Sequence, residues 1–182
     1  ESNLEDEESD VEEEKCVKKG CELPEPDNSN TLYLVIKQVY FDQIIAGTKT
    51  KEYREVKYST YKKYVKTEDD GSVMFSDAIS DEELSKYQCE DDLNIYNNGV
   101  CPLIPKNWCY LNLAVGYNKK RDTALVEVVD ITFEAETDKS GNVVRFDFDG
   151  SDNVCFSPTG KLCLWIAVLH LGKVVRKEIV SK

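Results

Sequence analysis

One short segment, AGTKTKEYR at residues 46–54, holds the side chains in this sequence that are best suited to chemistry. Lys49, Lys51 and Arg54 can bind phosphate or base acceptors, and Glu52 can accept from an exocyclic amine or orient Arg54. A partly buried lysine close to a glutamate can also have a shifted pKa and carry protons. The segment therefore predicts a ligand-binding site or a site of proton transfer.

The segment lies within a longer basic and aromatic stretch, residues 37–66, whose net charge is +5 and which contains half of the ten tyrosines. Cations neutralise phosphates and aromatic faces stack on bases, so this composition is typical of single-stranded RNA or nucleotide binding. The alternative is a solvent-exposed strand whose lysines only offset acidic residues elsewhere. The basic residues are Lys37, Lys49, Lys51, Arg54, Lys57, Lys62, Lys63 and Lys66, and the tyrosines are Tyr40, Tyr53, Tyr58, Tyr61 and Tyr64.

The alternation of a β-strand predicts how the side chains of this segment are arranged. Thr50, Glu52 and Arg54 share one face, so Glu52 and Arg54 can form an ion pair. Lys51 and Tyr53 point the other way. Lys49 follows the C-terminus of a predicted short helix, where a positive charge also complements the helix dipole.

Histidine and cysteine usage narrows the possible chemistry. His170 is the only histidine, so two-histidine metal centres are excluded and a catalytic triad would have to use His170. We expect His170 to be a core or groove-lining residue instead. The seven cysteines are odd in number and irregularly spaced, which indicates reduced thiols in a cytoplasmic protein rather than a disulfide framework or zinc site. We expect no metal and no cofactor. The longest apolar run, residues 162–171, is too short to span a membrane.

The chain is predicted to be mainly β, with short helices. Residues 31–40 and 50–58 are strand-like, and a short helix between them ends near Gly47. Strand-like segments joined by polar turns return at residues 110–117, 123–135, 143–149 and 161–180. This order predicts an α+β, mainly β class and a small antiparallel or mixed barrel.

Two acidic regions stand outside this pattern. Residues 1–27 carry a net charge of −9, out of −12 for the whole chain, so the low pI does not exclude a nucleic-acid site on the remaining body. We predict that residues 1–30 form a disordered acidic tail, with a docking or self-shielding arm as the alternative. Residues 67–107 resemble an acidic, loop-rich insertion, in which Ser80 and Glu83 predict one capped helix.

The string from Gly47 to Arg54, GTKTKEYR, resembles the G-x-K-x-x-E-x-R signature of the ASCH domain, a PUA-like β-barrel family. The order of the surrounding elements is similar as well: a strand, a short helix, the motif, a variable insertion and closing strands. The resemblance covers residues 31–57 and 108–180. It implies that residues 31–182 form a PUA-like β-barrel with short helices and a loop-rich insertion at about 67–107.

The resemblance implies a pocket for RNA or a modified nucleoside, because PUA-like relatives bind RNA. The ligand-binding candidates are Lys37, Lys49, Lys51, Glu52, Tyr53 and Arg54. Some ASCH proteins are hydrolases, either ribonucleases or an amidohydrolase of N4-acetylcytidine with a catalytic Lys, Thr and Glu. Lys49 matches that lysine, but Glu52 stands where the amidohydrolase has its nucleophilic threonine, and a carboxylate does not replace a hydroxyl in acyl transfer.

Three functions therefore stay open at this point. Binding of RNA or a modified nucleotide comes first. A hydrolase at the same site, with Lys49 and Glu52 as catalytic proton carriers, is the alternative. A protein-interaction module that works through its acidic surfaces is the third. The sequence does not indicate an oligomeric state.

Overall fold

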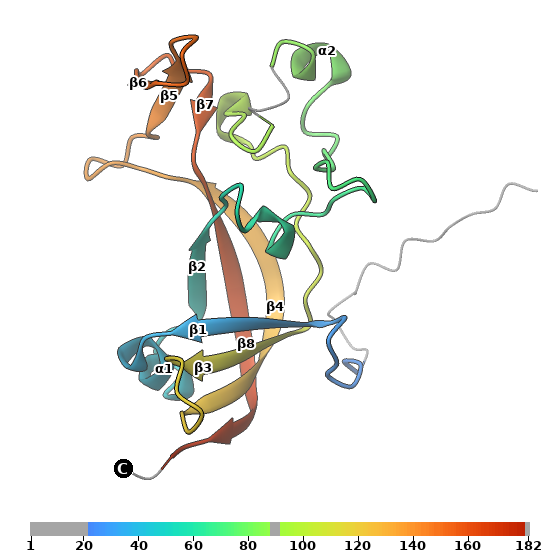
Figure 1. Cartoon of the computed structure of the whole chain (residues 1–182), viewed down its shortest axis with the longest axis vertical. Coiled ribbons are helices and arrows are strands. Elements are labelled where there is room, and N and C mark those ends of the chain that lie inside the picture. The colour runs from blue at the N-terminus through green and yellow to red at the C-terminus, as the bar shows by residue number, and fades with distance from the viewer. Residues whose placement is uncertain (1–21, 88–91, 181–182) are drawn as a thin grey trace, which may run out of the picture.

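Two β-sheets organise the chain, which a computed structural model describes over residues 22–87 and 92–180 (Figure 1). The expected mainly β class is confirmed. The larger sheet has the strand order β1-β3-β4-β8-β2, and the smaller has the order β6-β5-β7. The strands are β1 (Thr31–Ile36), β2 (Lys51–Glu55), β3 (Tyr110–Val115), β4 (Thr123–Ala135), β5 (Arg145–Phe148), β6 (Val154–Phe156), β7 (Leu162–Cys163) and β8 (Trp165–Glu178).

The larger sheet is curved but open. β1 pairs with β3 in parallel, and its other three pairings are antiparallel. The register of β4 against β8 shifts three times between Leu125 and Asp130, and such bulges increase twist and bend a sheet. β1 and β2 are its two edge strands, and no backbone ladder joins them in the described part of the chain. The closed barrel expected from the sequence is therefore not formed by backbone hydrogen bonds.

The core is formed by this sheet together with the helix and loops that pack on it. Leu32, Leu34 and Ile36 of β1 are buried at alternate positions, as expected for a strand with one apolar face. The α-helix α1 (Gln38–Ile45) adds Phe41 and Ile44 to the same hydrophobic cluster. Burial of these side chains holds α1 against the sheet. It thereby fixes the position from which the chain enters β2.

Helix α1 begins earlier than the sequence predicted. The predicted strand 31–40 is wrong after Ile36, because the backbone turns at Lys37 and the N–H groups of Tyr40 and Phe41 donate to its carbonyl. Gly47, with φ of +75°, ends the helix in the left-handed conformation that glycine adopts without steric cost. Near the C-terminus, the single predicted strand 161–180 divides at Leu164 into β7 and β8.

The loop-rich segment at residues 67–107 is anchored to the strands. It contains α2 (Asp81–Leu84), whose predicted cap is confirmed because the Ser80 hydroxyl accepts from the Glu83 N–H at 3.2 Å. The 3₁₀-helices η1 (Tyr61–Lys63) and η3 (Asn97–Gly99) lie before it and within it. The backbone carbonyl of Asn94 accepts from Cys163 N at 2.8 Å, and Ile95 forms a bridge with Leu162. These contacts hold the segment against β7.

Residues 22–30, which we assigned to the acidic tail, run along the body of the protein. Leu23 packs against a small cluster that contains Cys109 and Leu125, and the Tyr110 hydroxyl donates to the Pro24 carbonyl at 2.8 Å. The rest of the predicted tail, residues 1–21, lies outside the described residues. Within the described ranges, no helix has the length and apolar character needed to cross a membrane.

Candidate functional site

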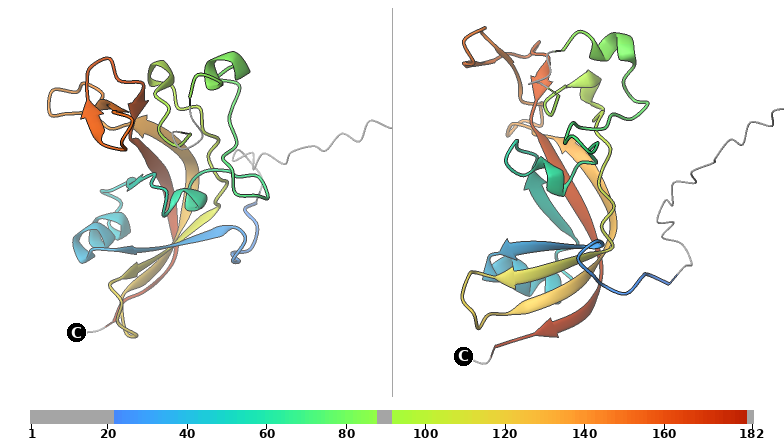
Figure 2. Two further views of the ribbon diagram at one scale, coloured as in Figure 1. Left: turned by 45° about the horizontal axis from the view of Figure 1, so that its top comes forward. Right: turned by 45° about the vertical axis from the view of Figure 1, so that its right-hand side comes forward.

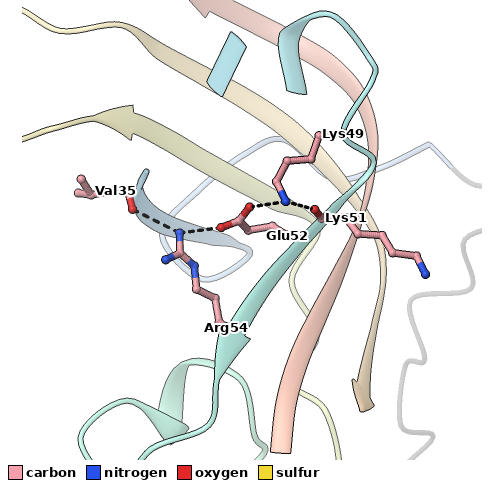
Figure 3. Close-up of polar contacts among 5 residues, drawn as sticks. All are labelled: Val35, Lys49, Lys51, Glu52 and Arg54. Atoms are coloured by element: carbon pink, nitrogen blue, oxygen red, sulfur yellow. Dashed lines mark hydrogen bonds and ion pairs between the residues drawn. The ribbon is translucent and has the colours of Figure 1, made fainter. Parts of the chain in front are cut away.

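Glu52 is the centre of a charged network on the inner face of β2 (Figure 3). Its side chain is only 7% exposed, and both carboxylate oxygens are engaged. Oε2 lies 3.2 Å from Lys49 Nζ, and Oε1 lies 2.9 Å from Arg54 Nη2. The predicted ion pair between Glu52 and Arg54 is confirmed. Both oxygens are paired and the side chain is buried, so Glu52 is held between its two cationic neighbours.

Arg54 joins the two edge strands of the larger sheet. Its Nη2 atom, which pairs with Glu52 on β2, also donates to the Val35 carbonyl on β1 at 3.3 Å (Figure 3). A side chain therefore bridges the two edges that no backbone ladder connects. The Arg54 Nε atom is buried and has no hydrogen-bond partner among the described residues.

Lys49 occupies the opposite side of Glu52. Its Nζ atom donates to the Lys51 carbonyl at 2.5 Å and lies 5.4 Å from the ring centroids of both Tyr40 and Tyr53. These contacts hold the turn between α1 and β2. The Lys51 side chain extends away from the network (Figure 3).

A cleft of about 630 Å³ opens beside Arg54, between β1 and β2. Three basic side chains and one carboxylate line it, and Glu55 is paired with Lys57 at 2.6 Å. The rings of Tyr33, Tyr53 and Tyr117 are exposed. The full lining is Tyr33, Leu34, Val35, Tyr53, Arg54, Glu55, Lys57, Thr60, Lys63, Tyr64 and Tyr117.

Tyr64 supplies a buried phenol to this cleft. Burial raises the pKa of Tyr64 above its usual value of 10.0, an effect that the nearby Arg54 charge opposes. The phenol therefore keeps its proton at neutral pH. A protonated hydroxyl can both donate to and accept from a ligand.

The structure divides the predicted site residues into two groups. Tyr53 and Arg54 line the cleft, whereas Lys37, Lys49, Lys51 and Glu52 do not. Lys37 is exposed at the residue before α1. Tyr33 and Tyr117 also line the cleft but lie outside the predicted site residues. Alternation with the buried Leu32 and Leu34 could have predicted the outward Tyr33, but Tyr117 lies in the turn after β3 and carries no such signal.

His170 is half-buried and lies away from the cleft lining. Its Nε2 atom is 2.8 Å from the Thr132 hydroxyl, and the residue pairs in register with Lys51 and Asp130. Throughout residues 22–87 and 92–180, no group of three or more His, Cys, Asp or Glu side chains is placed to hold a metal ion. The described side chains at the site are suited to hydrogen bonding, charge pairing and stacking.

Comparison of the chain with protein-family models, with curated proteins and with solved structures finds no match. The ASCH resemblance therefore stays a prediction from the motif and the order of elements. The function of the cleft has to be argued from its residues and their geometry.

Proposed function

We propose that the cleft between β1 and β2 binds single-stranded RNA, or a modified nucleotide, by holding one base and an adjacent phosphate. The observation that carries the proposal is the Arg54 guanidinium, which lines the cleft and is held in place from two sides by Glu52 and Val35. A fixed arginine loses little side-chain entropy when it binds an acceptor. Its planar donors match phosphate oxygens and base acceptors.

The tyrosines of the cleft can stack on a base, and its lysines can neutralise a phosphate. Tyr33 and Tyr53 lie on opposite edge strands and expose their rings, which offers a base a stacking surface. Lys63 adds a charge that can neutralise phosphate. Aromatic faces and cations that line the same cleft favour a nucleotide over a purely apolar ligand.

Binding is better supported than hydrolysis. The hydrolase alternative needs Glu52 to exchange protons with a substrate, but this carboxylate is buried and both of its oxygens are paired. Lys49 is also engaged, by Glu52 and by the Lys51 carbonyl. The role proposed for Glu52 is to orient Arg54.

We also propose that the chain is an ASCH domain with a PUA-like barrel. The order strand, helix, motif strand and closing strands supports this assignment. The Arg54 bridge between β1 and β2 supports it too, because it links by a side chain the edges that a closed barrel would join. The described cysteines Cys101, Cys155 and Cys163 are free thiols, which is compatible with the cytoplasmic location we propose.

The test is fluorescence polarisation with a short labelled single-stranded RNA at two salt concentrations. We expect Tyr53→Ala to weaken binding by about 1–3 kcal/mol, the range for one base stacked on one aromatic ring. Replacing both Lys57 and Lys63 by glutamine should weaken binding and reduce its salt dependence. The matched control replaces Lys139 and Lys177, which lie outside the cleft and change the net charge equally. A panel of acylated cytidines, added as competitors of the labelled RNA, tests whether the cleft binds a modified nucleotide.

Three results would contradict the proposal. One is an equal loss of affinity in the cleft and control double variants, which would mean that only net charge matters. Another is the absence of binding to RNA and to every nucleoside of the panel at low salt. The third is turnover of RNA or acylated cytidine by the wild-type protein that Glu52→Gln and Lys49→Met abolish, because this would establish the hydrolase.

A further inference from the structure

The smaller sheet carries an exposed apolar patch, which we call the β6 patch and define as Phe148, Val154 and Phe156. These side chains share one face, because Phe148 pairs with Val154 and Phe156 pairs with Phe146 in the β5–β6 ladder. Phe146 lies on the same face but is buried, and its ring contacts those of Phe148 and Phe156 edge to face, at centroid distances of 5.7 and 6.2 Å. Phe156 is 71% exposed. Exposed apolar patches of this kind mark interaction surfaces in folded proteins.

β6 is an edge strand whose outer backbone groups are available. Asp149 N donates to Asn153 O, and Ser157 N donates to Arg145 O, on either side of the β5–β6 ladder. Hydrogen-bonded pairs alternate along an antiparallel ladder, so the backbone groups of Val154 and Phe156 point away from β5. Among the described strands, β6 pairs with β5 alone. An extended chain can therefore add to this edge.

A groove of about 700 Å³ lies next to the patch and includes Phe156 in its wall. Tyr96, Val143, Val144 and Pro158 make much of the wall apolar. The wall is fixed by Arg145, whose guanidinium stacks 4.0 Å from the Tyr96 ring centroid and donates to the carbonyls of Pro158 and Gly160. A groove that keeps its shape without a ligand loses less entropy on binding. It can receive one apolar side chain of a strand added to β6.

The surroundings of the patch are acidic. Asp149 and Asp152 lie in the turn that leads into β6, and Asp138 lines the groove. Hydrogen bonds from Ser151 and Asn153 lower the pKa of Asp149 to about 2, so this carboxylate stays charged at neutral pH. The basic side chain of the groove, Arg145, is already committed to backbone carbonyls. The charges therefore favour a cationic partner over an acidic one.

We propose that β6 is a docking edge for an extended peptide segment of another protein, in which apolar side chains alternate with lysine or arginine. The backbone of this segment extends the smaller sheet beside Val154 and Phe156, its apolar side chains cover the patch and enter the groove, and its cations face Asp149 and Asp152 in the turn before β6. This site is independent of the proposed RNA cleft. Figure 1 and Figure 2 show β6 at the end of the molecule away from the C-terminus, with β1 and β3 nearer the other end.

The test uses the full chain and a labelled peptide of alternating lysine and valine. One control peptide alternates lysine with serine and has the same charge, and another alternates glutamate with valine. We expect the lysine–valine peptide to bind about tenfold more tightly than either control, because only this peptide carries both apolar and cationic side chains. Hydrogen exchange should show new protection of the amides of Val154 and Phe156.

Variants of the β6 edge separate backbone addition from simple apolar contact. Phe156→Ser should weaken binding by about tenfold or more, because it removes the most exposed ring of the patch. Val154→Pro should do the same by removing an outward N–H that the β5 ladder does not use. The control is Val175→Ser near the C-terminal end of β8, since Val175 is 50% exposed and Val154 is 48% exposed. It should change affinity by less than about twofold. RNA binding should be unchanged in Phe156→Ser.

Several outcomes would overturn the proposal. Equal binding of the lysine–serine peptide would show that charge alone is responsible. Unchanged affinity in Phe156→Ser, in a variant with wild-type circular dichroism, would place binding elsewhere. Sedimentation of the peptide-free protein as a dimer that Phe156→Ser dissociates would make a second copy of the chain the occupant. No binding of the lysine–valine peptide at low salt would remove the basis for a cationic partner.

Discussion

Replacing Glu52 by glutamine should destabilise the protein, because this carboxylate holds two cations on the inner face of β2. Glutamine keeps the shape of the side chain and one oxygen acceptor, but it has no charge. Lys49 at 3.2 Å and Arg54 at 2.9 Å would each lose a charged partner. The bridge from Arg54 to Val35 would weaken with them, and so would the link between β1 and β2.

The magnitude follows from burial. Removing one partner of a fully buried ion pair costs about 3–5 kcal/mol, because the remaining charge has no compensation. Here the side chains of Lys49 and Arg54 are 18% and 29% exposed, so water compensates part of the loss. Because glutamine also retains one acceptor, we expect a loss of about 2 kcal/mol in the free energy of unfolding. For a chain of this size, that corresponds to a decrease in Tm of about 4–8 °C.

The assay is thermal and urea unfolding followed by circular dichroism, with Glu55→Gln as the matched control. Glu55 is on the same strand and pairs with Lys57 at 2.6 Å, but its side chain is 52% exposed. An exposed pair contributes about 0–1 kcal/mol, so the control should change stability by less than about 1 kcal/mol. Equal effects of the two substitutions, or a stable Glu52→Gln variant, would refute the claim that the buried network joins the sheet edges.

Two further predictions concern the region around β5 and β7. Gly160→Ala should destabilise the protein by about 1–3 kcal/mol, measured by urea unfolding, because the added Cβ would lie 2.6 Å from backbone atoms of Phe146; wild-type stability would contradict this close approach. Burial raises the pKa of Cys163 from 9.0 to about 12, so the folded state holds this proton more tightly than the unfolded state. Stability should therefore decrease as the pH rises above about 9, and the decrease in the urea midpoint should be smaller in Cys163→Ala; an identical pH dependence in both proteins would contradict it.

Short-range sequence patterns determined individual strands, helix ends and one ion pair of this protein. The β-branched and aromatic residues that begin at Thr31, the cap at Ser80 and the glycine at position 47 each act within a few residues. The sequence alone therefore predicted a strand, a helix start and a helix end. The alternation of side chains put Glu52 and Arg54 on one face of a strand. Their ion pair was predictable because it requires only the local geometry of β2.

The tertiary structure decided which strands pair, which strands become sheet edges and which side chains line the cleft. Pairing of β1 with β3 and of β2 with β8 joins segments far apart in the sequence, and no local pattern specifies such partners. This pairing leaves β1 and β2 as edges, brings Tyr33 and Tyr117 to the cleft and buries Glu52 between two cations. Burial is a property of the whole assembly of strands. The motif residues therefore divide between a buried charged network and the wall of a cleft only after the sheet has formed.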